Sequence, residues 1–242
     1  MHRLRLQLPP GHWAQYRYLD LVHDALVNAW IAAGARPEQV IGAQALPWTF
    51  APLGFHRHHE GFIHTLVVST SDAALSAILA TIDPCTVRYA RAATGERLDF
   101  SSASVVVESS PILTEQTTLG VLTLSPIAIS DQSVTRKRWH TSLDAVDLSA
   151  VVNSRLSRIS GRQISLRVQP DSLYLRANPR HSVVVSTKRM KNGQPAFVIG
   201  MQAPLVISGS RSDVLLAWYA GLGEKTRNGF GCLGLAEEGV GR

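Results

Sequence analysis

The sequence predicts an α+β fold made of two similar halves, each with its elements in the order β-α-β-β-α-β. Two observations predict this order. Alternating apolar residues indicate short strands, and apolar residues at helical spacing indicate two helices in each half. Glycine, proline and an Asn-Gly pair lie between these segments and mark the expected turns. Because β-α-β-β-α-β is the split βαβ arrangement, we expect two tandem ferredoxin-like domains, also called RRM-like.

The first half begins with a strand, since leucine alternates with polar residues from Leu4 to Leu8. A helix is expected over residues 16–33, where apolar residues share one face. Gly34 then supplies a C-terminal stop.

Two strands are expected next, over residues 45–53 and 61–69, followed by a second helix. Ser71 or Asp72 is the expected N-cap of that helix. The segment CTVRYA, residues 85–90, is expected to return as the fourth strand of the first sheet.

The second half repeats the pattern after residues 92–118, which we interpret as extra strands or a connecting loop. The expected elements are strands at 120–130 and 163–169 around a helix at 142–160, a hairpin at Asn192-Gly193, a helix capped by Ser212 or Asp213 and ended by Gly221, and a closing strand at 230–235. We place the domain boundary after residue 115, which gives an N-terminal domain of 1–115 and a C-terminal domain of 116–242.

Composition narrows the class of protein. The 242 residues are 45% hydrophobic and 17% charged, which is a globular profile. No apolar run approaches the roughly 20 residues of a membrane span, and the first residues lack the apolar core of a signal peptide. Cys85 and Cys232 are too few for a disulfide framework or a four-cysteine zinc site. We therefore expect a cytoplasmic protein without a membrane partner.

Positive charge is concentrated in the middle of the chain. Residues 133–191 contain 12 Lys and Arg against 3 Asp and Glu, whereas residues 1–132 contain 8 against 11. Such a local excess is typical of a protein that binds a polyanion. An ordinary solvated basic surface is the alternative explanation.

A glycine-rich loop, GLGEKTRNGFGCLGL, covers residues 221–235. It is not a phosphate-binding P-loop, because Glu224 precedes Lys225 and the loop follows a helix instead of opening one. It is not a dinucleotide fingerprint either, since Thr226 stands at the third glycine position. An anion there would need backbone N–H groups together with Lys225 and Arg227.

The glycines of this loop suggest a close approach of the backbone to a partner. We expect this of Gly221, Gly223, Gly229 and Gly231. A helix cap followed by a tight turn is the alternative, and it accounts better for the first two glycines than for the last two.

The segment AGLGEKTRNGFG, residues 220–231, resembles the C-terminal glycine-rich loop of the CRISPR repeat-processing endoribonucleases of the RAMP superfamily. Residues 197–225 are similar to the strand and helix that precede this loop in the family. LPWTFAPLGF, residues 46–55, resembles the motif after its first helix. The resemblance implies tandem ferredoxin-like domains.

The resemblance also implies a function in CRISPR RNA maturation. Members of the family cut precursor CRISPR RNA within each repeat without a metal or other cofactor. A ribose 2′-hydroxyl attacks the adjacent phosphate and leaves a 5′-hydroxyl and a 2′,3′-cyclic phosphate. Many members stay bound to the repeat stem-loop, as precursor and as mature guide RNA, and join other subunits in an effector complex.

Three groups of cations are candidate RNA contacts. Arg155, Arg158 and Arg162 lie at i, i+3 and i+7 and form a stripe on the expected helix. The remaining candidates precede this helix, lie on the hairpin or belong to the glycine loop: Arg136, Lys137, Arg138, Lys188, Arg189, Lys191, Lys225, Arg227 and the four glycines. Phosphates and 2′-hydroxyls would be their targets, because the major groove of duplex RNA is too narrow to read.

Catalytic candidates come from the family resemblance. Members that use a histidine take it from the first helix or from the segment after it, which points to His23. A core histidine is an equally good explanation of His23. The segment before the Thr-Phe pair contains Arg36 but no histidine, so Arg36, Arg17 and Tyr16 are further candidates for charge stabilisation or for orienting the 2′-hydroxyl.

Two other functions remain open. The chain could be a non-catalytic subunit that binds guide RNA in an effector complex, which the missing histidine favours. A metal-dependent phosphohydrolase would use HRHHE, residues 56–60, with His64. We expect no metal site, because no H-E-x-x-H motif or cysteine partner accompanies these histidines.

Overall fold

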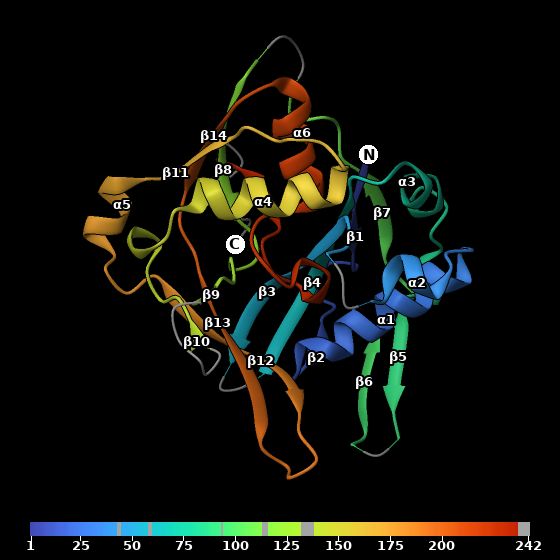
Figure 1. The fold of residues 1–242 in the computed structure, drawn as a ribbon. Helices are drawn as coiled ribbons and strands as arrows, with labels where there is room; N and C mark the ends of the chain where they lie inside the picture. The colour runs from blue at the N-terminus through green and yellow to red at the C-terminus, as the bar shows by residue number, and fades with distance from the viewer. Residues whose placement is uncertain (43–44, 58–59, 93, 113–115, 132–137, 237–242) are drawn as a thin grey trace.

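The computed structural model describes residues 1–42, 45–57, 60–92, 94–112, 116–131 and 138–236. The two larger sheets are antiparallel and separate, the first formed by strands before residue 108 and the second by strands after residue 117 (Figure 1), and the remaining described strands form two-stranded hairpins or pairs. Helices pack against each sheet. The chain forms the first sheet and its helices before it forms the second sheet and its helices.

The first sheet has the strand order β3-β4-β1-β7, with every neighbouring pair antiparallel. Its strands are β3 (Trp48–Arg57), β4 (Glu60–Thr70), β1 (His2–Gln7) and β7 (Ser104–Val107). The short strand β2 (Ala14–Tyr16) pairs with Gly61–Ile63 on β4. Numbered along the chain, the four main strands lie in the order 2-3-1-4, which is the order of a ferredoxin-like sheet.

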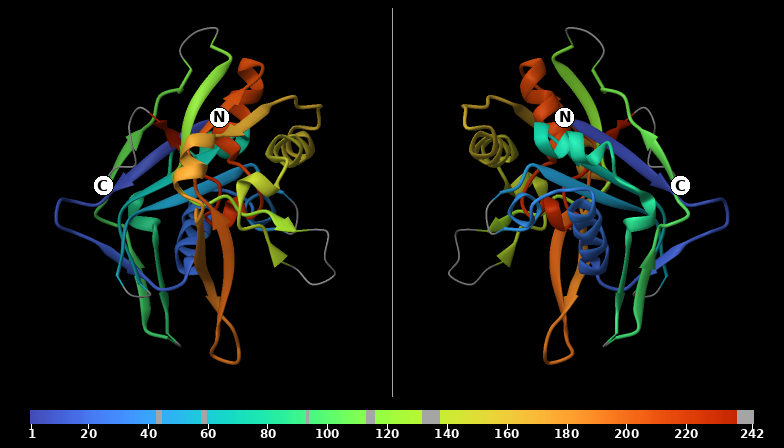
Figure 2. Two further views of the ribbon diagram at one scale, coloured as in Figure 1. Left: turned by 90° about the vertical axis from the view of Figure 1, so that its left-hand side faces the viewer. Right: turned by 90° about the vertical axis from the view of Figure 1, so that its right-hand side faces the viewer.

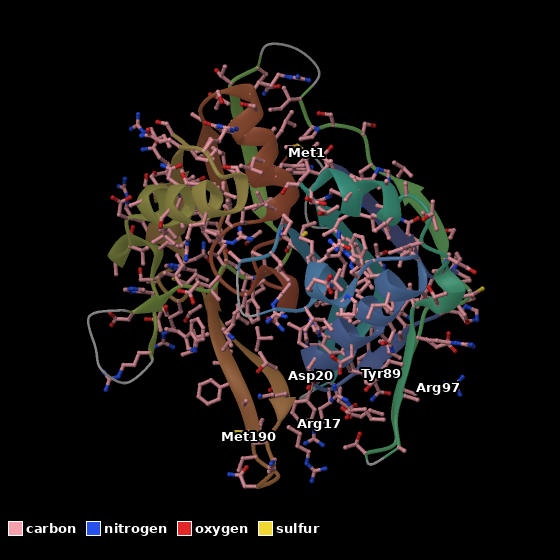
Figure 3. The ribbon with its side chains drawn as sticks, turned by 45° about the vertical axis from the view of Figure 1, so that its right-hand side comes forward. Met1, Arg17, Asp20, Tyr89, Arg97 and Met190 are labelled. Atoms are coloured by element: carbon pink, nitrogen blue, oxygen red, sulfur yellow. The ribbon has the colours of Figure 1, made fainter. Side chains whose placement is uncertain are left out.

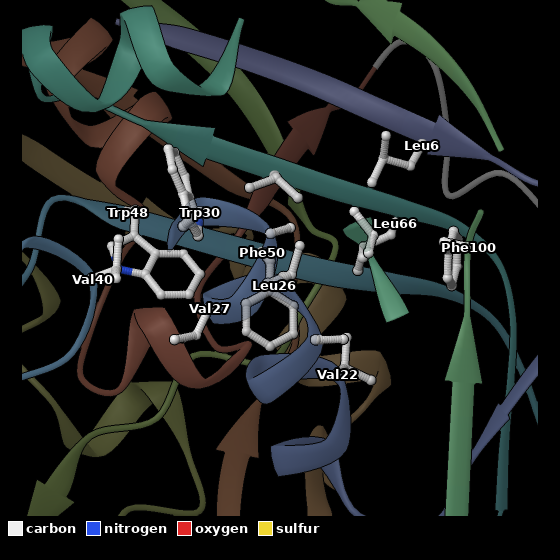
Figure 4. Close-up of a cluster of buried hydrophobic side chains, with 14 of the residues drawn as sticks. Leu6, Val22, Leu26, Val27, Trp30, Val40, Trp48, Phe50, Leu66 and Phe100 are labelled. Carbon is white, nitrogen blue, oxygen red and sulfur yellow. The ribbon is translucent and has the colours of Figure 1, made fainter. Parts of the chain in front are cut away.

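The helix α1 (Leu19–Ala32) lies across one face of this sheet and buries most of its apolar residues. Figure 4 shows Val22, Leu26 and Trp30 of α1 packed against Trp48 and Phe50 of β3. Each fully buried large side chain contributes about 1.5–3 kcal/mol to folding, so this face fixes α1 on the sheet. The smaller helices of this half are α2 (Pro37–Val40), α3 (Ala73–Leu79) and η1 (Pro84–Thr86).

Asp72 caps α3 as expected, since its carboxylate accepts a hydrogen bond from the Leu75 backbone N–H at 2.8 Å. The expected start of the first helix is wrong by three residues, because α1 begins at Leu19 and Tyr16 ends β2.

The expected fourth strand of the first sheet is also wrong. β5 (Arg88–Arg91) pairs with β6 (Glu96–Asp99) in a separate hairpin, and the valine-rich β7 takes the edge beside β1. Gly95, with φ +70°, forms the turn that keeps β5 and β6 together.

The second sheet has the strand order β11-β14-β8-β15, again antiparallel throughout. Its strands are β11 (Arg167–Pro170), β14 (Leu205–Ser208), β8 (Thr118–Thr123) and β15 (Leu233–Leu235). In chain order the strands again lie as 2-3-1-4, which confirms the α+β fold of two tandem ferredoxin-like domains. The boundary after residue 115 stays a prediction, because residues 113–115 lie outside the described ranges.

Two helices, α4 (Leu148–Ser160) and α6 (Arg211–Ala220), pack against the second sheet. The cap of α6 differs from the expectation. Ser210, and not Ser212 or Asp213, is the N-cap, and its hydroxyl accepts from the Asp213 N–H at 3.2 Å. Gly221 ends α6 as expected, with φ +76°.

The predicted hairpin at Asn192-Gly193 is confirmed. β12 (Ser182–Arg189) pairs with β13 (Pro195–Met201), and Gly193 has φ +80°. The hairpin projects away from the rest of the second half and runs beside α1 of the first (Figures 1 and 2), where Val185 and Val198 join the first core. The other small elements of this half are β9 (Ser130–Asp131), β10 (Arg138–Trp139), η2 (Leu143–Ala145), α5 (Ser172–Ala177) and η3 (Thr226–Asn228).

Polar contacts join the two halves. Thr49 and Ser69 of the first sheet donate hydrogen bonds to the carbonyl oxygens of Phe230 and Tyr219, at 3.0 and 2.9 Å. The fully buried Arg3 pairs with Glu108 at 2.5 Å and lies 4.4 Å from the Trp218 ring centroid. The glycine-rich segment and α6 are therefore held directly against the first sheet.

Candidate functional site

A cleft of about 1020 Å³ lies between α4 and the glycine-rich loop. Ile129–Asp131 around β9, His140 after β10 and Leu46 from the first half also line this cleft. The charged residues that line it are Asp131, Asp147, Arg155, Arg158, Glu224, Lys225 and Arg227. The cleft thus gathers cations from the predicted basic helix and from the predicted loop at one place.

The glycines of the loop are packed against protein atoms. A Cβ on Gly231 would lie 1.8 Å from the Leu222 carbonyl oxygen, and one on Gly229 would lie 2.8 Å from the Phe50 ring. Gly221 and Gly223 meet backbone oxygens at 2.8 and 2.7 Å in the same way. All four have φ between +68° and +83°.

These contacts correct the expected reason for the glycines. A side chain is excluded at each of the four positions by the protein interior and by backbone conformation, so an RNA backbone is not needed to explain them. The explanation as a cap and turn is the better one, extended to all four residues.

Lys225 is an exposed cation of this loop and directly precedes η3. It is the only residue other than glycine with a positive φ among those the structure describes, with φ 55° and ψ 30°. Its ammonium nitrogen lies 5.9 Å from the centroid of the Trp139 ring, so loop and β10 meet across the cleft. A non-glycine residue in the left-handed region costs about 1 kcal/mol or more and is often found at functional sites.

Arg155 does not belong to an exposed stripe. Its side chain is buried, and its guanidinium donates to the carbonyl oxygens of Gly221, Ala220 and Leu46, at 2.8, 3.1 and 3.3 Å. A fourth hydrogen bond reaches the Thr226 hydroxyl at 2.7 Å. Burial lowers the pKa of Arg155 to about 9, which leaves the group charged at neutral pH. The expected phosphate contact of Arg155 is therefore wrong: this arginine holds the glycine loop and ties it to the first half.

The two other arginines of the expected stripe are exposed. Arg158 lines the cleft, whereas Arg162 lies beyond the end of α4 and pairs with Asp213 at 2.6 Å. Arg227 is half-buried, and burial lowers its pKa. Of the three arginines of the expected stripe, only Arg158 is exposed in the cleft, because Arg162 forms an ion pair with Asp213 of α6.

The hairpin cations are exposed, as an RNA-binding surface requires. Lys188, Arg189 and Lys191 surround the tip of β12–β13, and Arg138 on β10 is exposed as well. Figure 3 shows Met190 at the hairpin tip at the same end of the molecule as Arg17. Two further expected contacts, Arg136 and Lys137, lie outside the described residues.

His23 on α1 does not line the cleft between α4 and the loop. Its ring stacks on Trp48 with centroids 6.0 Å apart, and Nδ1 lies 3.0 Å from the Asp24 carboxylate. Nε2 is buried and has no hydrogen-bond partner among the residues that the structure describes. These contacts are those of a histidine at the rim of the core, one of the two explanations that the sequence left open.

The other catalytic candidates lie apart from the cleft. Tyr16 is buried in β2, where burial raises the pKa of its hydroxyl, so its expected position on the first helix is wrong. Arg17 precedes α1, and its guanidinium lies 5.7 Å from the Tyr18 ring centroid. Arg36 is exposed and pairs with Glu38 at 3.4 Å.

The segment that faces the loop, around Ser130 and His140, is not among the residues predicted from the sequence. Ser130 donates to the Glu224 carboxylate through its backbone N–H at 2.9 Å, and His140 lines the cleft beside Trp139. A signal was present, since Trp139 and His140 directly follow the basic run Arg136–Arg138. Their approach to the loop depends on contacts across about 90 residues of sequence, which periodicity does not reveal.

Among the described residues, no three His, Cys, Asp or Glu side chains lie close enough together to hold a metal ion. His58 and His59 of the histidine cluster lie outside them. None of the described helices is long and apolar enough to cross a bilayer.

Several solved structures share this fold. They include a Cas6-related protein from Pyrococcus furiosus, with 16% identity, a TM-score of 0.71 and coverage of 98% of this chain and 99% of that one. A RAMP protein binding different RNA substrates has 16% identity, a TM-score of 0.69 and coverage of 97% and 99%. A Cas6 product complex has 15% identity, a TM-score of 0.56 and coverage of 96% and 97%.

No curated protein matches the sequence. The family model described as CRISPR associated protein Cas6, C-terminal, matches residues 108–235, which is more than half of the chain and includes α4, the hairpin and the glycine-rich loop. The chain belongs to the Cas6 family of CRISPR-associated proteins.

Proposed function

We propose that this protein is a metal-independent endoribonuclease that cuts precursor CRISPR RNA within its repeats. The observation that carries the proposal is the cleft between α4 and the glycine loop, where Arg158, Lys225 and Arg227 gather in a member of the Cas6 family. Cations in a cleft with low-dielectric walls attract a polyanion and can stabilise charge that develops on a phosphate.

The RNA partner is a repeat stem-loop, bound as precursor and retained as mature guide. An RNA ligand is supported by one protein of the same fold, which is described as a RAMP protein binding different RNA substrates. Another is described as a Cas6 product complex. The exposed cations Lys188, Arg189 and Lys191 of the hairpin extend the basic surface beyond the cleft. Such a protein works in the cytoplasm, alone or with other subunits of a CRISPR effector complex.

The proposed reaction is a transesterification that releases the downstream RNA fragment with a 5′-hydroxyl. The ribose 2′-oxygen attacks the adjacent phosphorus and loses its proton, while the bond from phosphorus to the 5′-oxygen breaks and that oxygen gains a proton. The products are a 2′,3′-cyclic phosphate and a 5′-hydroxyl. A base, an acid and cations around the phosphorane are sufficient for this reaction, so the proposed mechanism requires no metal or cofactor.

Incubation of the protein with repeat RNA in EDTA tests this proposal. We expect a single cut that leaves a 2′,3′-cyclic phosphate, and no cut when the ribose on the 5′ side of the scissile phosphate is replaced by 2′-deoxyribose. The deoxy RNA should still bind, because one hydroxyl among many phosphate contacts is lost. Cleavage of the deoxy RNA, or activity that needs an added divalent metal, would contradict the mechanism.

A non-catalytic guide-RNA subunit is the second candidate. The observation that favours it is the position of His23, whose ring packs on Trp48 and whose Nε2 is buried. Tight binding of repeat RNA without any cleavage over a range of repeats, metals and pH values would support this function instead.

A further inference from the structure

The cleft contains a histidine that the family resemblance did not indicate. His140 is half-buried, directly follows β10, and is the one histidine among the described residues that line the cleft. Its backbone N–H donates to the Ile129 carbonyl oxygen at 3.0 Å, which fixes the chain at this point. Imidazole is the side chain best suited to accept and return a proton near neutral pH.

Lys225 faces the same part of the cleft from the glycine loop. Its ammonium nitrogen lies over the ring of Trp139, the residue next to His140, at 5.9 Å from the ring centroid. The loop holds Lys225 at φ 55°, although glycine, which adopts a positive φ at four other positions of this loop, would take that conformation without strain. A strained lysine retained where glycine fits better is an observation that points to a role for its side chain.

We propose that His140 and Lys225 are catalytic residues of this protein, on the endoribonuclease function proposed above. As the 2′-oxygen bonds to phosphorus, Nδ1 or Nε2 of His140 takes the 2′-hydroxyl proton. As the bond to the 5′-oxygen breaks, the Lys225 ammonium gives that oxygen a proton. Exchange with solvent then removes the proton from His140 and restores the one on Lys225.

The surrounding charges are compatible with this pair. Glu224 is occupied by Ser130, whose backbone N–H donates to the carboxylate at 2.9 Å and whose hydroxyl donates to the same oxygen. The other charged groups that the structure places in the cleft are Asp131, Asp147, Arg155, Arg158 and Arg227. Of these, Arg155 is committed to the loop carbonyls, so Arg158 and Arg227 remain to contact the flanking phosphates.

Single-turnover cleavage of repeat RNA in EDTA tests the assignment with His140→Ala, Lys225→Ala and the control His12→Ala. His12 is exposed on the loop between β1 and β2, outside the cleft. We expect His140→Ala and Lys225→Ala to lower the cleavage rate at saturating protein at least 100-fold, with RNA affinity within about fivefold of wild type for His140→Ala. The His12 variant should cut as the wild type does.

Added imidazole supplies a readout that a structural role would not give. The cleft is large enough to admit it, so imidazole should restore a measurable part of the cleavage by His140→Ala and none of the cleavage by Lys225→Ala. Wild-type rates for His140→Ala would overturn the assignment, as would loss of activity in His23→Ala that imidazole restores. A wild-type protein that cuts no repeat RNA would refute the proposed function itself, independently of these variants.

Discussion

The glycine loop and the β12–β13 hairpin both carry cations and glycine, yet they are built in opposite ways. The loop lies between the two halves, and its glycines Gly221 to Gly231 are buried against β3, Leu222 and the segment around Ala128. The hairpin projects into solvent beside α1, and its tip from Lys188 to Lys191 is exposed (Figure 1). A Cβ added to Gly193 at that tip would come no closer than 3.8 Å to another residue.

The difference shows that similar composition serves different purposes in the two regions. The conformation of the loop is determined by packing, by Arg155 and by the first sheet, so its glycines are needed for the fold. The conformation of the hairpin tip follows from local turn chemistry, so its side chains are available for a ligand. We therefore expect substitutions of the loop glycines to lower stability, and substitutions of the cations at the hairpin tip to weaken RNA binding.

The largest expected effect is that of Gly231→Ala. The new Cβ would lie 1.8 Å from the Leu222 carbonyl oxygen at φ +68°, so the loop would have to move. We expect the free energy of unfolding to fall by about 3–5 kcal/mol, the combined cost of overpacking and backbone strain. Denaturant titration followed by circular dichroism measures it.

Gly161→Ala is the matched control for this substitution. Gly161 follows α4 with the same φ of +68°, but a Cβ there would meet nothing within 4 Å. Only backbone strain remains, about 1 kcal/mol. Equal destabilisation by the two variants would show that packing around the loop is not what requires glycine.

Arg155→Ala should have the next largest effect. Four acceptors, including the carbonyl oxygens of Gly221 and Ala220, would lose their donor, and a cavity would open beside the loop. We expect a loss of about 3 kcal/mol in stability. Arg158→Ala, one turn further along α4 and exposed, should change stability by less than about 0.5 kcal/mol.

Arg155→Lys separates charge from geometry at this site. A lysine supplies the charge but not the planar fork of donors that reaches four acceptors, so it should recover only part of the lost stability. Full recovery by lysine would mean that charge alone, and not the hydrogen-bond geometry, holds the loop.

The hairpin should behave in the opposite way. Replacing Lys188, Arg189 and Lys191 with alanine should leave the thermal midpoint within about 2 °C, because these side chains are exposed. RNA affinity should fall, and the slope of log affinity against log salt should decrease by about 0.7–0.9 for each phosphate contact removed. An unchanged slope would exclude the hairpin tip from the RNA interface.

Local signals predicted much of this structure from sequence. The period of Leu4 to Leu8, the cap at Asp72 and the Asn192-Gly193 turn each depend on neighbouring residues, and each is confirmed. The position of β7 beside β1 was missed because pairing across about 100 residues leaves no local signature.

Arg155 could have been identified from its position. It lies seven residues after Leu148 and three after Val152, in line with the apolar face of α4, so its burial follows from the helical period. Its spacing from Arg158 and Arg162 masked this alignment. The meeting of His140 and Lys225 in one cleft depended on tertiary packing, and no spacing in the sequence predicts it.

Lys225→Gly tests the central claim most directly, that the loop is shaped by packing while its cation acts on RNA. Glycine adopts φ 55° without strain, which offsets part of the contact with the Trp139 ring that is lost with the exposed side chain, so we expect the free energy of unfolding to stay within about 1 kcal/mol of wild type. Single-turnover cleavage of repeat RNA by the same preparation should fall at least 100-fold. A variant that keeps its stability and cuts at the wild-type rate would contradict the account.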